Sequence, residues 1–139
     1  MMFDPNESIQ LQGFTAPFIQ NAHARIKSLI RKADSMGLEI AENDIKKISS
    51  MESVERDVII ELSRFENKIR EAAKDYSPAI IANFAFDLAK QYNQFYQNIP
   101  IFKESDIDKL KFRMAFSKVV AGVIKKSMGM LGIAVPEKM

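Results

Sequence analysis

Residues 77–96 read SPAIIANFAFDLAKQYNQFY. Ser77 is a residue type that caps helices, and Pro78 suits the first helical turn because its missing N–H has no partner to lose there. Large apolar or aromatic side chains then recur at intervals of three and four residues: Ile81, Phe84, Leu88, Tyr92 and Phe95. This period places them on one face of an α-helix. The segment is therefore predicted to be a long amphipathic helix.

The same period is present upstream, in residues 15–37. Thr15 can cap this helix, Pro17 suits its first turn, and Gly37 is a natural terminator just past its end. Its apolar face consists of Ile19, Ala22, Ile26, Leu29 and Ala33. A short helix is predicted around residues 43–48.

Two more helices complete the pattern. One begins near Ser49, whose spacing to Glu52 has the form of a capping box, and continues to about residue 76. The other has a second capping box in Ser105 and Asp108, and Gly132 closes it. No alternating period of two and no repeat of 20–50 residues competes with this interpretation. The chain is predicted to be all-α, a helical bundle of about four long amphipathic helices plus short connecting helices.

At 139 residues the chain fits one domain. Residues 1–14 have no sustained period and contain Pro5 and Gly13, so they are predicted to form an extended lead-in to a helical domain at 15–139. The start of the chain has no basic segment followed by an apolar run, so no secretory signal is expected. No stretch approaches ~18 uninterrupted apolar residues, so no membrane contact through a spanning helix is expected.

The chemistry needed for catalysis is absent from the sequence. The chain has no cysteine and a single histidine, His23, which we expect to be a packed helix residue. No glycine-rich phosphate loop and no HExxH motif occurs, and the acidic pair Asp106 and Asp108 is explained by a helix start. We expect no catalytic residues, no metal site and no cofactor in this chain. It is not predicted to be an enzyme.

Side chains suited to RNA are concentrated in residues 84–96, where aromatic rings alternate with Asn and Gln. Aromatic faces stack unpaired bases, amides reach base edges, and lysine or arginine neutralises phosphate. Tyr92 and Tyr96 are predicted to be the surface aromatics, because a tyrosine hydroxyl needs a polar partner. Two basic clusters are candidates for phosphate contact or are ordinary solvated faces: Arg25, Lys27, Arg31 and Lys32, and Lys118, Lys125 and Lys126.

The net charge of +2 neither supports nor excludes an RNA partner. An alternative hypothesis is a helical protein–protein interaction module without RNA binding. The eight methionines agree with it, because methionine adapts well to partner surfaces.

Two motifs at opposite ends of the chain resemble one family. Residues 12–33, QGFTAPFIQNAHARIKSLIRKA, are similar to the arginyl-tRNA synthetase segment Q-G-N-T-G-P-Y-x-Q-Y-A-H-A-R-I-x-S-I-x-R-K-A. Phe95, Tyr96, Arg113 and the terminal residues 128–139, MGMLGIAVPEKM, resemble the family's F-Y…R…G-L-x-L-L-G-I-x-x-P-E-R-M ending. The chain thus resembles the C-terminal, DALR-type anticodon-binding domain of a bacterial arginyl-tRNA synthetase, separated from its catalytic core.

The resemblance implies a tRNA-binding domain that recognises the anticodon stem-loop of arginine tRNA and positions it for aminoacylation. The catalytic core of the same parent chain would be its second partner, would use ATP and Mg, and would make the parent an arginine–tRNA ligase in the cytoplasm. Residues 1–14 would then be the junction with that core. The implied tRNA contacts are Phe18, Asn21, Arg25, Tyr92, Tyr96 and Met139. Asn21 replaces a tyrosine of the family and cannot stack as its ring would.

Overall fold

The computed structural model describes residues 15–46 and 50–132. Within them the chain forms five α-helices and two short 3-10 helices, and no strand. Their order is α2 (Ala16–Ser35), η2 (Glu42–Lys46), α3 (Ser53–Ser63), α4 (Phe65–Asp75), α5 (Pro78–Asn98), η3 (Ile101–Lys103) and α6 (Ile107–Met130). The all-α prediction is confirmed. The lead-in at residues 1–14 lies outside the described residues.

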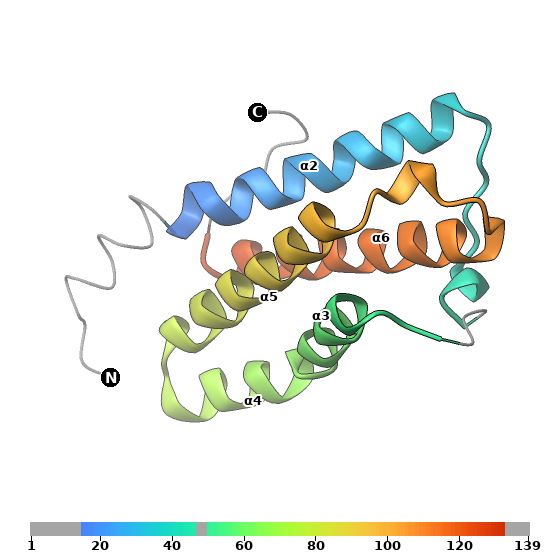
Figure 1. The fold of residues 1–139 in the computed structure, drawn as a ribbon. Helices are drawn as coiled ribbons and strands as arrows, with labels where there is room; N and C mark the ends of the chain where they lie inside the picture. Colours follow the sequence, from blue (N-terminus) through green and yellow to red (C-terminus); the bar gives the residue numbers. More distant parts are fainter. Residues whose placement is uncertain (1–14, 47–49, 133–139) are drawn as a thin grey trace.

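The long helices α2, α5 and α6 pack against one another, and α3 and α4 cover the other side of α5 (Figure 1). Helices α2 and α5 run in the same direction, and α6 runs back beneath them. The predicted stripe of α5 lies in the interior, where Phe95 meets Phe116 edge to face with ring centroids 4.8 Å apart. Such aromatic pairs add to the stability that area burial provides.

The sequence predicts the C-terminal end of α2 correctly but not its N-terminal cap. Gly37 has φ +73° and its N–H donates to the Asp34 carbonyl, so the predicted terminator is confirmed. Thr15 has helical backbone angles and makes no side-chain capping hydrogen bond. The prediction that Thr15 caps α2 is therefore wrong, because a capping residue needs a non-helical backbone.

The predicted helix from residue 49 to 76 is divided into α3 and α4 at Arg64. The Ser63 hydroxyl donates to the Ile60 carbonyl, the normal acceptor for the Arg64 N–H, which donates to the Glu61 carbonyl instead. Such back-bonding by serine bends helices. The capping box at the start of α3 is Glu52 with Glu55, not Ser49 with Glu52, and Ser49 lies outside the described residues.

The capping residue of helix α6 lies one position later than predicted. Asp106, not Ser105, is the capping residue, and its carboxylate accepts from the N–H groups of Asp108 and Lys109. The carboxylate is a charged acceptor at the positive end of the helix dipole, which favours it over the neighbouring hydroxyl.

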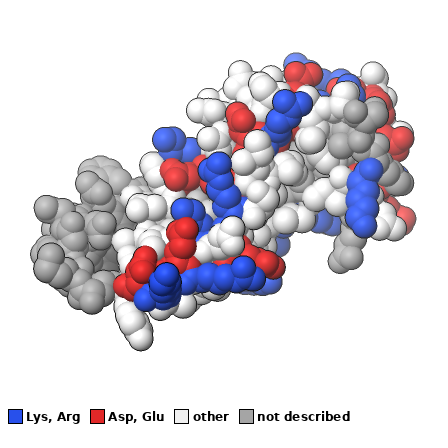
Figure 2. Space-filling view, turned by 90° about the horizontal axis from the view of Figure 1, so that it is seen from below, with Lys and Arg blue, Asp and Glu red and all other residues white. Residues whose placement is uncertain are grey.

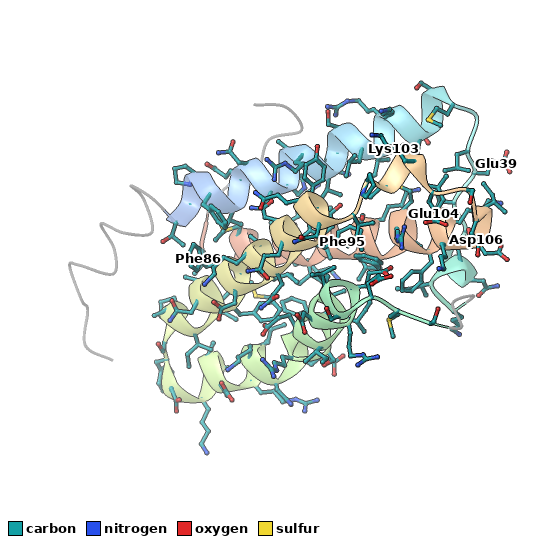
Figure 3. The ribbon with its side chains drawn as sticks, in the orientation of Figure 1. Glu39, Phe86, Phe95, Lys103, Glu104 and Asp106 are labelled. Carbon is teal, nitrogen blue, oxygen red and sulfur yellow. The ribbon has the colours of Figure 1, made fainter. Side chains whose placement is uncertain are left out.

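A buried ionic network joins α3, α6 and the turn before α6. Arg113 is buried, and its Nε donates to Glu55 Oε2 while its Nη1 donates to Glu104 Oε2, both at 3.2 Å. The second oxygen of Glu55 accepts from the Glu52 N–H and caps α3. Figure 3 shows Glu104 beside α6, between η3 and the start of that helix. The network fixes α3 against α6 because breaking a buried pair leaves an unpaired charge.

Candidate nucleic-acid interface

The line of contact between α2 and the parallel segment α5–η3, here called the α2–α5 seam, carries three contacts that involve an aromatic ring. The α2 residues involved are seven apart, about two helical turns, and so share one face. The contacts are Phe18 with Phe86 at 5.1 Å between centroids, the Arg25 guanidinium over Tyr96 at 4.4 Å, and Lys32 Nζ over Phe102 at 4.6 Å. Figure 3 labels Phe86 and Phe95, which lie at different points along α5.

Arg25 stands at the centre of the α2–α5 seam. Its Nη1 donates a 2.7 Å hydrogen bond to Asn93 Oδ1, and its guanidinium lies over the Tyr96 ring. Asn93 and Tyr96 are three residues apart on α5, so they bracket the guanidinium from one helix face. Tyr96 remains 37% exposed. The seam therefore presents a fixed cationic plane beside an accessible aromatic ring.

The prediction of a surface Tyr92 is wrong. Its side chain has no exposed area, and its hydroxyl lies 2.8 Å from the Ser117 hydroxyl, which in turn donates to the Arg113 carbonyl at 2.6 Å. Burial raises the pKa of Tyr92 above its usual range, against a smaller opposite effect from the Ser117 hydrogen bond. A ring in this position cannot stack on a base, so Tyr92 is a core residue that packs against Phe95.

The remaining sequence-predicted contacts fall in different surroundings. Phe18 is half-buried, and its ring packs against Phe86 within the seam. Asn21 is exposed on α2, one turn before Arg25. The structure thus brings Phe18, Asn21, Arg25 and Tyr96 to one region, while Met139 lies outside the described residues. Asn93 was not singled out from the sequence, because only the fold brings it to Arg25, 68 positions away.

Electrostatics distinguish α2 from the opposite side of the molecule. Helix α2 carries four basic side chains and one acidic one. The face formed by α3 and α4 mixes both signs (Figure 2), and ion pairs there join Arg64 to Glu61 and Arg70 to Glu66. Basic side chains that are already paired attract phosphate weakly. The seam is therefore the better site for an anionic partner.

The part of the chain that the structure describes contains no group of three or more His, Asp or Glu side chains arranged to hold a metal ion. His23 is buried on α2. None of the helices in residues 15–46 and 50–132 is both long and apolar enough to cross a membrane.

A family profile described as "DALR anticodon binding domain" matches residues 19–139. The chain belongs to this family. The profile covers α5, α6 and all of α2 after its first three residues, so every seam contact residue except Phe18 lies within it. The resemblance inferred from the two terminal motifs is confirmed.

Proteins similar to this DALR domain are named arginine–tRNA ligases. Those of Phocaeicola vulgatus and Bacteroides fragilis are each 44% identical over 139 residues, which is all of this chain and 23% of theirs. The chain thus spans about a quarter of the length of these relatives. The Thermus thermophilus arginyl-tRNA synthetase structure has a similar domain, with a TM-score of 0.78 and 27% identity over 99% of this chain and 23% of that one. Nothing in these comparisons supports the alternative of a protein-interaction module.

Proposed function

We propose that this DALR domain binds the anticodon stem-loop of an arginine tRNA at the α2–α5 seam. The observation that carries the proposal is the Arg25 guanidinium held between Asn93 and the half-exposed ring of Tyr96. Anticodon bases in a loop are unpaired, and proteins hold such bases by stacking them on aromatic rings and guanidinium planes.

The chemistry of the seam fits a loop better than a duplex. Of the five N–H donors of Arg25, one is used by Asn93, so others remain for base or phosphate acceptors. The exposed amides Asn21 and Gln97 flank Arg25 and Tyr96 and can reach base edges. Lys32, over Phe102, adds a positive charge two turns along α2 from Arg25. Together these groups offer stacking, base-edge hydrogen bonds and phosphate neutralisation.

In this proposal the domain serves a larger cytoplasmic arginine–tRNA ligase. The catalytic core of the same parent chain would bind ATP and Mg, and this domain would position the tRNA for it. The proposal is supported by relatives that are about four times longer and carry that name.

The test is a fluorescence-anisotropy titration of the 139-residue chain with an arginine-tRNA anticodon stem-loop and with the same hairpin carrying a swapped anticodon. Tyr96→Ala removes the exposed seam ring. Tyr76→Ala is the matched control, because Tyr76 is a 77% exposed tyrosine in the turn between α4 and α5.

The parental chain should prefer the cognate hairpin. Tyr96→Ala should lose about 1–3 kcal/mol of binding free energy, the value of one base–aromatic stack. Tyr76→Ala should bind as the parental chain does. Equal binding of both hairpins by the parental chain, or an unchanged affinity of Tyr96→Ala for the cognate hairpin, would overturn the assignment of the seam.

A further inference from the structure

One side of α6 alternates lysine with small residues at intervals of four and three. The series is Lys111, Ala115, Lys118, Gly122, Lys125 and Gly129. This period keeps all six on one side of the helix. The series, here called the Lys–Gly face, lies opposite the buried Phe116, Val120 and Ile124. Its C-terminal four members are exposed, whereas Ala115 is buried beside residues 40–46.

The lysines of the Lys–Gly face form no ion pair within the described part of the chain. Helix α6 has six basic side chains and one acidic one, and the acidic residue, Asp108, lies in its first turn. Within residues 15–46 and 50–132, no carboxylate lies within 4 Å of the ammonium groups of Lys118 or Lys125. By contrast, Lys68 on α4 pairs with Glu71. The Lys–Gly face is therefore a concentrated positive charge available to an external anion.

The two glycines have no explanation in the fold. Gly122 and Gly129 are exposed, lie inside α6, do not have positive φ, and have no described atom within 4 Å of the position a Cβ would take. Glycine is among the least favourable residues in a helix interior. Their effect is to leave the helix surface bare between the lysines, where an incoming backbone can approach closely.

A groove continues the Lys–Gly face on one side. It has a volume of about 630 Å³ and lies between α6 and residues 40–46. Lys118 contributes to its wall from α6, and Lys46 contributes from η2. Two like charges on the walls of one groove repel each other, and an anion between them would offset that repulsion by attracting both.

We infer that the Lys–Gly face binds the sugar-phosphate backbone of an RNA stem. The inference rests on the proposed function and adds a second contact to it, at a face of α6 that its packing with α2 and α5 leaves uncovered. A second copy of this chain fits poorly, since it would bring lysines against lysines. Lysine contacts to phosphate raise the affinity for RNA and make it depend on salt, but they do not distinguish one base sequence from another.

The experiment uses the 139-residue chain with a full arginine-tRNA transcript and an anticodon-swapped transcript, titrated at several salt concentrations. The test variant is Lys118→Gln/Lys125→Gln. The matched control is Lys68→Gln/Lys74→Gln, which removes the same charge from α4. The test variant should reduce the slope of log affinity against log salt by about two, one for each phosphate contact. It should leave the ratio of cognate to swapped affinity unchanged, and the control should leave both quantities unchanged.

A second variant tests the glycines independently of charge. Gly122→Gln should raise Tm by about 3 °C through helix propensity and still weaken binding of the transcript at least about threefold, because it blocks close approach. Ala73→Gln places the same side chain at an exposed small residue of α4 and should not affect binding.

The outcomes separate this inference from the proposed function. The chain could discriminate between the transcripts while Lys118→Gln/Lys125→Gln leaves the salt slope unchanged. This result would overturn the role of the Lys–Gly face in RNA binding and leave the proposal for the seam intact. It is also the result expected if the Lys–Gly face binds an acidic protein helix. A reduced slope without discrimination would support the Lys–Gly face and refute anticodon reading. Failure of the parental chain to bind either transcript would overturn both.

Discussion

Replacing Tyr92 by phenylalanine tests whether its hydroxyl is buried, neutral and bonded to Ser117. The substitution keeps the ring and removes one hydrogen bond, while the Ser117 hydroxyl keeps its bond to the Arg113 carbonyl. A single internal hydrogen bond contributes about 1 kcal/mol. Tyr92→Phe should therefore lower the free energy of unfolding at pH 7 by about 1 kcal/mol.

The destabilising effect of the same substitution should be lost at high pH. Because burial raises the pKa of Tyr92 in the folded state, its stabilising contribution is complete below the unfolded-state pKa of about 10 and is lost as pH rises above that value. At pH 11 the unfolded tyrosine is mostly ionised while the folded one is not, which favours unfolding by about 1 kcal/mol. Phenylalanine has no proton to lose. Tyr92→Phe and the parental chain should thus have nearly equal free energies of unfolding at pH 11.

Urea denaturation followed by circular dichroism at pH 7 and pH 11 measures both differences. Comparing the two chains at each pH removes the shared effect of lysine deprotonation. Tyr76→Phe is the control, since the Tyr76 side chain is 77% exposed and should give coincident curves with the parental chain. A Tyr92→Phe difference that is the same at both pH values would refute the reasoning.

Three further outcomes are expected. Glu55→Ala should lower the free energy of unfolding by about 3–5 kcal/mol in urea denaturation, because it leaves the Arg113 charge buried without its α3 partner; a loss below 1 kcal/mol would contradict this. Gly37→Ala should destabilise by about 1–2 kcal/mol because of its positive φ, whereas Gly122→Ala should stabilise by about 1 kcal/mol; thermal melts showing the same sign for both would argue against the assigned backbone roles. Arg25→Lys should weaken hairpin binding and leave its salt slope unchanged, because lysine keeps the charge and loses the planar contact with Tyr96.

The positions of the long helices could be predicted because burial of one face imposes a 3-4 period on the sequence. Helix α5 begins at Pro78 as predicted, although the Ser77 side chain makes no capping hydrogen bond, and α2 ends beside Gly37. The division at Arg64 could not be predicted in this way, because the stripe of apolar residues continues through it. At the break, the Ser63 hydroxyl donates a hydrogen bond to the Ile60 backbone carbonyl.

The candidate site was predicted only in part, for a related reason. Periodicity placed Tyr92 in the apolar stripe, while the need of its hydroxyl for a polar partner suggested the surface. The hydroxyl meets Ser117, 25 residues later on α6, and this pairing exists only in the folded chain. The contact of Arg25 with Asn93 is likewise a product of the parallel packing of α2 and α5. Sequence motifs identified the residue types of the seam, and tertiary packing determined which of them are accessible.

The central claim, that the α2–α5 seam is the surface that binds the anticodon loop, can be tested by NMR. A ¹⁵N-labelled sample of the chain would be titrated with the arginine-tRNA anticodon stem-loop while the backbone amide shifts are recorded. The account predicts the largest shift changes near Asn21–Arg25 and Asn93–Gln97, with little change along α4. Changes concentrated on α4, or an absence of change at the seam when the hairpin is saturated, would contradict it.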